Sequence, residues 1–294
     1  MSGPSQAAPP WTAERAVSAE LARALIAEQF PQLAPERVEP LGEGWDNTVF
    51  AVDGKRVFRF PRRQIAVPLL ETELRILPSL PRLPLPVPVP EFRGAPTDRF
   101  PWPFAGYRLL PGRTADQAAL SLAQREAAAE PLGRFLRALH AVPPSNAGPD
   151  PLRRLDAQRM RTLTAPRLQQ LGIAPPDFFD ADVRAPRETT LVHGDLHARQ
   201  ILVDGEGALC GVIDWGDAHR GDPACDVSIA HTLLPPQARP AFRAAYGELD
   251  DDTWALARLR GLHLAAALAV YAKDRGDERL LGEALLAIGF SSTT

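Results

Sequence analysis

A run of closely spaced prolines limits the folds open to this chain more than any other feature. Six prolines fall within residues 78–92, which read PSLPRLPLPVPVPEF. Proline has no backbone N–H and its ring clashes with the preceding helical turn, so this segment is expected to be extended. Proline-rich runs also serve as ligands for aromatic-lined grooves, but the apolar residues between these prolines favour a structural connector. The chain therefore has two parts separated by an extended segment.

Short β-rich runs dominate the part before the connector. Residues 37–41, 48–52 and 55–60 read as strands, and Asp53-Gly54 separates the last two. Two such runs joined by Asp-Gly predict a β-hairpin, because a type I′ turn needs positive φ at both central residues. Apolar residues recur at helical spacing over 12–30, which predicts an amphipathic helix in front of the strands.

A second helix and a further strand flank the connector. Residues 69–80 have helical periodicity, and 104–110 (FAGYRLL) read as a strand closed by Pro111-Gly112. Helices dominate afterwards, with apolar stripes formed by Leu132, Phe135, Leu136 and Leu139, and by Leu256, Leu259, Leu262 and Leu264. The sequence therefore predicts an α+β protein with a small antiparallel β-rich amino-terminal part and a larger, mainly helical carboxyl-terminal part.

Length and composition fit two lobes with proper cores. The chain has 294 residues, of which 45% are apolar and 23% charged. A net charge of -3 without any lysine/arginine run argues against nucleic-acid binding and against a membrane partner. Cys210 and Cys225 form neither a metal-binding spacing nor a disulfide scaffold. Residues 1–10 lack a secretory signal and 262–272 are too few for a membrane span, so we expect a cytoplasmic protein.

One strand-rich island interrupts the helical part. Residues 191–215 read LVHGDLHARQILVDGEGALCGVIDW. The expected strands cover 201–203 and 208–213, with a turn at 204–207. Because a hairpin returns the chain to its starting point, we expect Asp214 close to the loop that carries Asp195 and Gln200.

Two carboxylates and an amide at one end of a hairpin suit phosphoryl transfer. That reaction needs positioning, neutralisation of phosphate charge and a group that takes the proton of the acceptor. One carboxylate can deprotonate a hydroxyl, while the second and the amide hold Mg²⁺, which prefers oxygen ligands. The alternative is that Asp195 and Asp214 merely cap helices. Caps alone would not account for two carboxylates at these spacings together with the upstream features below.

Two motifs of this island and one that follows it together resemble the signature of the aminoglycoside phosphotransferase family, whose members share the protein-kinase fold. They are H-G-D-L-H from His193, then I-D-W, then G-D-P-x-x-D over residues 221–226. The resemblance implies that Asp195 is the catalytic aspartate, that Asp214 binds magnesium and that His193 braces the loop. It covers nearly the whole chain and implies a two-lobed protein-kinase-like fold. The chain is also similar to macrolide phosphotransferases.

One position departs from the family pattern. The family usually has asparagine as a metal ligand five residues after the catalytic aspartate, and this chain has Gln200. Macrolide phosphotransferases have histidine there, so substitution need not abolish catalysis. The extra methylene moves the amide oxygen by roughly 1.5 Å, which leaves direct ligation, ligation through water and loss of the ligand all open. Loss would favour a pseudokinase-like sensor of nucleotide or metabolite without phosphotransfer.

A glycine-rich segment, LGEGWDN, lies between two predicted strands at residues 41–47. Such a turn lets backbone N–H groups approach phosphates without obstruction by side chains. It resembles the phosphate loop of the family, which implies nucleotide contacts for Gly42, Gly44 and Asn47. Residues 107–110 resemble the family's lobe-linking strand, which implies backbone contacts of Arg108 and Leu110 with the nucleotide base.

A cation and a carboxylate are expected beside that loop. Arg59 lies in the third strand, where the kinase plan has a cation that contacts phosphates and pairs with a helix carboxylate. Glu71 and Glu73 lie about 200° apart on a helix. Glu73 shares its face with Leu70 and Ile76, and a carboxylate within an apolar stripe needs a partner, so we choose Glu73. A purely structural ion pair is the alternative.

The sequence as a whole predicts a small-molecule kinase that transfers the γ-phosphate of ATP or GTP to a substrate hydroxyl with Mg²⁺, with aminoglycosides and macrolides among the candidate acceptors. We expect a disordered tail at 1–10, a nucleotide-binding lobe at 11–106, a hinge at 107–112 and a catalytic and substrate-binding lobe at 113–294. The acidic residues at 248–252 are read as a helix N-terminus rather than a site for a cationic substrate. His140 is expected to pack or hydrogen-bond rather than to catalyse.

Overall fold

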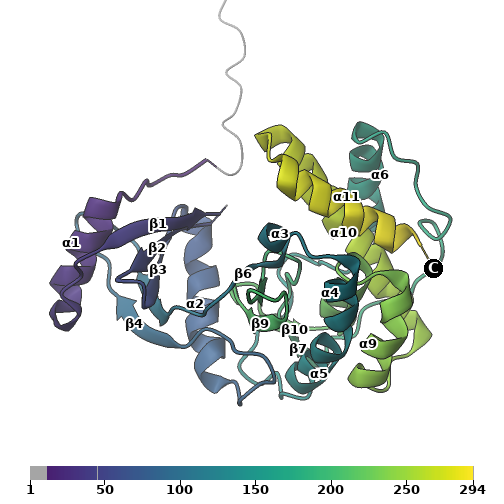
Figure 1. Cartoon of the computed structure of the whole chain (residues 1–294), viewed down its shortest axis with the longest axis horizontal. Helices are drawn as coiled ribbons and strands as arrows, with labels where there is room; N and C mark the ends of the chain where they lie inside the picture. The colour runs from purple at the N-terminus through teal and green to yellow at the C-terminus, as the bar shows by residue number, and fades with distance from the viewer. Residues whose placement is uncertain (1–11, 45, 294) are drawn as a thin grey trace, which may run out of the picture. The chain divides into compact units, whose positions relative to one another are not determined.

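The computed structural model describes residues 12–44 and 46–293 (Figure 1), so the predicted tail at 1–10 lies outside the described residues. The chain divides into two compact units. The first contains the residues up to Pro78 together with Pro88–Leu109, and the second contains Ser79–Val87 together with the residues from Leu110 onward. Residues 79–87, assigned above to the amino-terminal lobe, therefore belong to the second unit, because the Val212 N–H donates to the Pro86 carbonyl (2.9 Å).

A five-stranded antiparallel sheet forms the centre of the first unit, in the order β1-β2-β3-β5-β4. The strands are β1 (Val38–Glu43), β2 (Asn47–Val52), β3 (Arg56–Pro61), β4 (Pro90–Gly94) and β5 (Phe104–Arg108). The Asp-Gly hairpin between β2 and β3 is confirmed, because Asp53 and Gly54 both have positive φ, 51° and 63°. β4 was not predicted, since Pro90 begins it inside the proline-rich run. Proline is tolerated there because β4 lies at the edge of the sheet.

Two helices accompany this sheet, α1 (Ala19–Gln29) and α2 (Val67–Ile76). The first begins later than predicted, where the Ser18 hydroxyl caps it by accepting a hydrogen bond from the Leu21 N–H (3.2 Å). The second ends at Ile76 rather than at residue 80, because the chain continues into a 3-10 turn that contains Pro78.

The two faces of the sheet have different roles. Phe50, Phe58 and Phe60 are buried on one face and belong to the same apolar cluster as Leu25 of α1. Successive side chains of a strand point to opposite faces, so Arg59 lies on the face that is turned toward α2. Figure 1 shows α1 and α2 on opposite sides of the sheet. The aromatic core thus fixes the face on which Arg59 is presented.

The second unit is mainly helical and contains two small sheets, β6-β8-β9 and β7-β10. Its helices are α3 (Ala115–Ala118), α4 (Leu122–Ala127), α5 (Ala129–His140), α6 (Ala157–Gln170), α7 (Ala224–Val227), α8 (Ile229–Thr232), α9 (Arg239–Tyr246), α10 (Asp251–Arg275) and α11 (Glu278–Ser292). Its strands are β6 (Arg113–Thr114), β7 (Thr190–Val192), β8 (Ile201–Val203), β9 (Leu209–Val212) and β10 (His219–Gly221). The predicted hairpin is the β8–β9 pair, and the short strands β6, β7 and β10 complete the two sheets.

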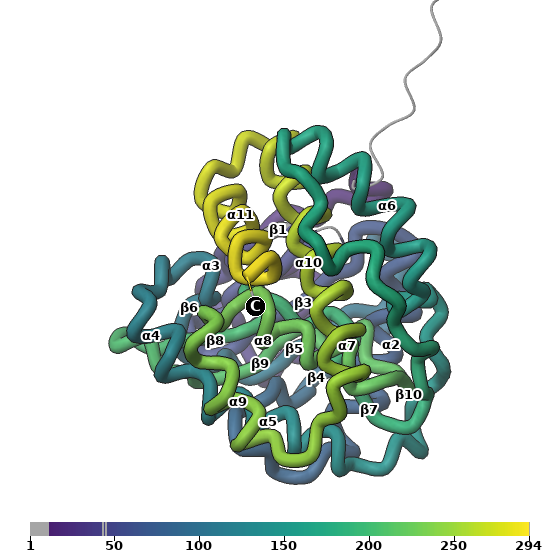
Figure 2. The backbone as a smooth tube through the Cα atoms, turned by 90° about the vertical axis from the view of Figure 1, so that its right-hand side faces the viewer, coloured from purple at the N-terminus to yellow at the C-terminus, as the bar shows by residue number. Residues whose placement is uncertain are grey.

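The 25-residue α10 lies against α6 and α11 (Figure 2). Its first turn confirms the reading of the acidic residues as a helix N-terminus, because the Asp250 carboxylate accepts a hydrogen bond from the Thr253 N–H (2.6 Å). By length and composition α10 could also cross a membrane, but 56% of its apolar window is buried inside the unit. That burial is the pattern of a core helix.

Candidate active site

The loop His193-Gly194-Asp195 follows β7 and requires a glycine at its centre. Gly194 has φ of 90°, and a Cβ atom placed there would lie 2.2 Å from the Asp217 carbonyl oxygen. A side chain at this position would therefore be strained by both its conformation and its surroundings. The tight turn fixes where the Asp195 side chain leaves the backbone.

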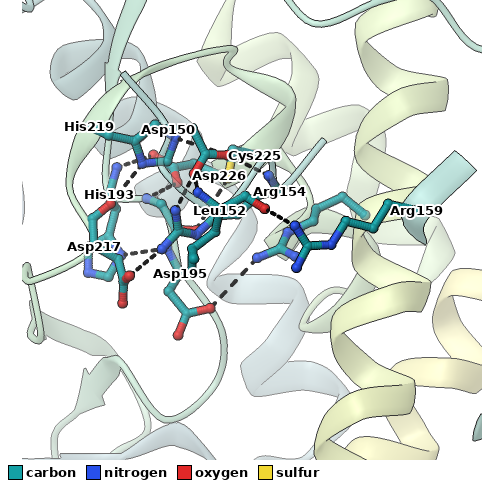
Figure 3. Close-up of polar contacts among 12 residues, drawn as sticks. Asp150, Leu152, Arg154, Arg159, His193, Asp195, Asp217, His219, Cys225 and Asp226 are labelled. Atoms are coloured by element: carbon teal, nitrogen blue, oxygen red, sulfur yellow. Dashed lines mark hydrogen bonds and ion pairs between the residues drawn. The ribbon is translucent and has the colours of Figure 1, made fainter. Parts of the chain in front are cut away.

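Asp226 of α7 anchors the backbone of this loop (Figure 3). Its carboxylate is fully buried and accepts hydrogen bonds from the N–H groups of His193 (2.7 Å) and Gly194 (2.9 Å). Nε2 of His140 lies 3.2 Å from the same carboxylate, and its Nδ1 lies 2.8 Å from the Tyr246 hydroxyl. The expectation that His140 forms hydrogen bonds is therefore confirmed.

The charge of Asp226 is maintained in spite of its burial. Burial alone would raise the pKa of this carboxyl, but the hydrogen bond from His140 and the backbone N–H of Gly194 outweigh it and lower the pKa. The residue therefore stays ionised near neutral pH, which is the state that accepts two backbone hydrogen bonds.

His193 connects the loop to the hairpin. Its Nε2 lies 3.0 Å from the carbonyl oxygen of Ile213, and its ring packs edge-on against Trp215 (4.9 Å between centroids). Asp214 lies between these two residues and has φ of 69°, a left-handed conformation that is uncommon for a residue other than glycine. The sequence predicted a bracing role for His193, and the structure gives it contacts on both sides of Asp214.

Gln200 lies beside Asp214 along the backbone, because the Ile213 N–H donates to the Gln200 carbonyl (2.9 Å). Its side chain is 8% exposed, and its Oε1 atom is buried without a hydrogen-bond partner among the described residues. A buried amide oxygen without a donor is costly, so it needs an explanation. A cation is one group that such an oxygen can bind.

Asp195 is about a third exposed (32%) and lies between an imidazole and a guanidinium. Its Oδ2 lies 3.6 Å from Nε2 of His197, and its Oδ1 lies 3.7 Å from Nη2 of Arg260 on α10. Burial alone would raise the pKa of Asp195, but His197 and the charges of Arg260 and Arg154 hold it well below its usual range. Asp195 is therefore a carboxylate at neutral pH and is free to accept a proton or orient a hydroxyl.

A buried ion cluster next to Asp195 was missed by sequence reasoning. Arg154 is 8% exposed and forms ion pairs with both Asp150 and Asp217 (Figure 3). Arg154 and Arg260 are far from Asp195 along the chain, so no local motif indicates that they meet there. The four-residue spacing of Asp150 and Arg154 was the one available signal, although it lies outside any helix.

In the first unit, Nη1 of Arg59 lies 2.7 Å from Oε2 of Glu73, whose side chain is 1% exposed. Glu71, the alternative, pairs with Arg93 at the surface (2.7 Å). The structure thus brings together the two residues that helix geometry selected, and their contact with nucleotide stays a prediction.

The remaining predicted nucleotide residues lie in or next to the sheet. Gly42 lies in β1, and Asn47 begins β2. The Gly44 N–H donates to the Asn47 carbonyl (3.0 Å), and Trp45 lies outside the described residues. Arg108 ends β5 with a side chain that is 76% exposed and pairs with Glu91 (3.3 Å). Leu110 begins the second unit.

The described residues contain no group of three or more histidine, cysteine, aspartate or glutamate side chains arranged for a metal ion. A divalent cation would therefore depend on fewer protein ligands, as magnesium commonly does when phosphates and waters complete its shell.

Comparison with known proteins decides the family. The model of the phosphotransferase enzyme family matches residues 37–262, which include both the glycine-rich turn and the island around Asp195. The chain belongs to this family. Its α+β, protein-kinase-like fold and the family resemblance expected from the motifs are thereby confirmed.

Curated relatives match part of this chain. The uncharacterized protein YcbJ of Bacillus subtilis is 26% identical over 175 residues, 55% of this chain and 57% of that protein. Viomycin phosphotransferase of Streptomyces vinaceus is 33% identical over 101 residues, 33% of this chain and 35% of that protein. The chain thus spans about half the length of the first relative and a third of the second.

Solved structures match nearly the whole of this chain. One of them is the GDP and kanamycin complex of APH(2″)-IIIa, which is 24% identical and has a TM-score of 0.64. The match covers 92% of this chain and 97% of that chain. At this identity the likeness shows the fold.

Proposed function

We propose that this phosphotransferase transfers the γ-phosphate of ATP or GTP to a hydroxyl group of a small molecule. One observation carries the proposal. Asp195 is presented on a loop whose backbone is fixed by Asp226, and that loop meets the hairpin end that carries Asp214 and Gln200. Membership in the phosphotransferase enzyme family and the similarity to viomycin phosphotransferase support the same reaction.

Asp195 orients the acceptor hydroxyl and takes its proton. The acceptor oxygen forms a bond to the γ-phosphorus, and the bond from that phosphorus to the β–γ bridging oxygen breaks, which releases the nucleoside diphosphate. The low pKa of Asp195 keeps it ionised before the reaction, so the group is ready to accept the hydrogen bond of the hydroxyl.

Asp214 and Gln200 are the residues that would hold magnesium, which neutralises phosphate charge when bound. The buried, unpartnered Oε1 of Gln200 fits such a cation, because it gives that oxygen a partner. Arg59, paired with Glu73, would contact phosphates from the first unit, with the backbone around Gly42, Gly44 and Asn47. The backbone around Arg108 and Leu110 would contact the base.

A thermal-unfolding series with ATP and GTP, each with and without Mg²⁺, tests the nucleotide and metal parts of this proposal. Nucleotide at 100 times its Kd adds ~2.7 kcal/mol to the free energy of unfolding, or about 5–10 °C for a chain of this size. Gln200→Leu keeps the side-chain size but removes the amide oxygen, so we expect it to lose the magnesium-dependent part of the shift. Gln237→Leu, at an exposed glutamine, is the matched control and should retain it.

Two outcomes would contradict the proposal. If neither nucleotide raises the melting temperature of the wild-type protein, the kinase assignment fails. If nucleotide raises it equally with and without Mg²⁺, the second candidate function gains support: a nucleotide sensor without phosphotransfer. The observation that favours a sensor is glutamine at position 200, where the family usually has asparagine.

Hydroxyl-bearing antibiotics are the first acceptor substrates that we propose to assay. A relative acts on viomycin by name, and kanamycin occupies a solved structure with the same fold. Transfer of radiolabelled γ-phosphate to viomycin, kanamycin and a macrolide would identify the class. Asp195→Asn should lower that transfer by roughly 10²–10⁴ and leave the nucleotide-dependent thermal shift unchanged, whereas retained transfer would remove Asp195 from the reaction. We also propose a cytoplasmic location, where the nucleotide is available.

A further inference from the structure

Arg260 is a buried cation with too few partners. It lies on α10 and is 5% exposed, and the described residues offer it one ion pair, with Asp195 at 3.7 Å. Its Nε atom is buried and has no hydrogen-bond partner among the described residues. Burial of a guanidinium without full hydrogen bonding lowers stability.

A second arginine on the same helix shows what a structural role looks like. Arg258 donates from Nε to the Ser291 carbonyl (2.8 Å) and from Nη2 to the Ser292 carbonyl (3.0 Å). Its guanidinium also lies over the Phe178 ring, 4.0 Å from the centroid. Arg258 therefore ties α10 to the end of α11, and this packing accounts for it. Arg260 has no equivalent set of contacts within the described chain.

The other basic side chains near Asp195 are either paired with other carboxylates or charged only when protonated. Arg154 contributes to the field at Asp195, but Asp150 and Asp217 form ion pairs with it and offset its charge. His197 is charged only when protonated. Arg260 is therefore the permanent cation near Asp195 whose charge is not offset by a second carboxylate in the described residues.

We propose that Arg260 is a positioning residue for Asp195. It directs Oδ1 and keeps the carboxylate ionised, so that the remaining lone pairs face the acceptor hydroxyl. The inference rests on the proposed phosphotransfer, in which Asp195 takes the proton of the acceptor; Arg260 itself takes no proton and contacts no reacting atom. The stability lost by burying an incompletely bonded guanidinium is then the cost of an oriented, charged base.

Arg260→Met tests the proposal, with Arg258→Met as the matched control and Arg260→Lys as the conservative variant. The assay is phosphate release from Mg-ATP or Mg-GTP with water as acceptor, measured against pH, beside urea unfolding of each variant. For Arg260→Met we expect unchanged or higher stability. On the acidic side of the pH–rate profile we expect at least a roughly tenfold loss of turnover, and the fall of the rate with acid should begin at a higher pH than in the wild type. Arg260→Lys should recover part of the turnover because the charge returns.

The control separates a positioning role from a structural one. Arg258→Met should lower stability and leave the pH profile at its wild-type position. If Arg260→Met instead lowers stability as Arg258→Met does, with a wild-type pH profile, Arg260 is structural and the proposal is overturned.

A second measurement keeps the inference testable if the proposed function fails. Should the wild-type protein release no phosphate and gain no nucleotide-dependent thermal shift, phosphotransfer itself is wrong. The ¹³C carboxyl signal of Asp195 can still be titrated by NMR in the wild-type and Arg260→Met proteins. A higher titration midpoint in the variant supports the contact with Arg260, and identical midpoints overturn it.

Discussion

The hydrogen bonds between Asp226 and the loop His193-Gly194-Asp195 lead to a direct prediction for the variant Asp226→Asn. The asparagine keeps the shape of the side chain and one oxygen, so one of the two backbone N–H groups of His193 and Gly194 loses its acceptor. A buried donor without an acceptor costs about 1–3 kcal/mol. The remaining hydrogen bond changes from charge-assisted to neutral, which weakens it by about 1 kcal/mol. We therefore expect a loss of about 3 kcal/mol.

Asp204→Asn is the matched control for this change. Asp204 also accepts hydrogen bonds from two backbone N–H groups, those of Glu206 (2.9 Å) and Ala208 (3.0 Å), but its side chain is exposed. Water replaces a lost partner there, so we expect a change within about 0.5 kcal/mol. Burial of the carboxylate is the variable that separates the two variants.

Thermal or urea unfolding at pH 7 measures both variants. At about 2–4 °C per kcal/mol, Asp226→Asn should lower Tm by roughly 6–12 °C, with little change for Asp204→Asn. Turnover should fall as well, since a displacement of about 1 Å at a reacting group can cost roughly 10²-fold. Equal and small losses of Tm in the two variants would refute the reasoning, because Asp226 would then not be what fixes the loop.

Two further predictions concern the helical unit. Arg125 is 1% exposed and donates to both carboxylate oxygens of Glu283 (2.9 and 2.6 Å). Arg125→Met leaves this carboxylate without its partner and should lower the free energy of unfolding by about 3–5 kcal/mol. The double variant with Glu283→Leu should recover most of that loss in urea unfolding, and no recovery would mean that the pair is not coupled. His231 is fully buried, and its burial, together with the charges of Arg239 and Arg258, lowers its pKa well below the usual value. The folded protein therefore keeps His231 neutral, while the unfolded chain binds a proton there below about pH 6.5. Wild-type stability should therefore fall relative to that of His231→Phe by about 1 kcal/mol between pH 6.5 and 5.5. Parallel pH curves for the two proteins would contradict this.

Local chemistry made part of the structure predictable from the sequence. The turn at Asp53-Gly54 was predicted because few residues tolerate positive φ twice in succession. Glu73 was preferred to Glu71 from helix geometry alone, and it is the one that meets Arg59. The β8–β9 hairpin was predicted from a turn between two apolar runs. In each case the physical cause lies within a short stretch of sequence, in one turn, one helix or one hairpin.

The parts that sequence reasoning missed depend on contacts between distant segments. β4 forms because an edge position tolerates Pro90, and nothing within the proline run indicates which strand it joins. Arg260 reaches Asp195 from a helix that begins well downstream, and Arg154 reaches Asp217 from a loop. The residues next to them in sequence do not indicate these contacts, because the tertiary packing of α10 and of the loop before α6 creates them.

The polar contacts of the candidate site divide it into a fixed side and an incomplete side. On the fixed side, Asp226 accepts two backbone N–H groups and His193 holds the Ile213 carbonyl, so the loop has little freedom. On the other side, buried polar atoms of Gln200 and Arg260 lack partners within the described chain. Folding alone would select against such atoms, because each lowers stability. Their position beside a rigid loop that carries Asp195 supports the two proposals made above, a cation at Gln200 and a positioning role for Arg260.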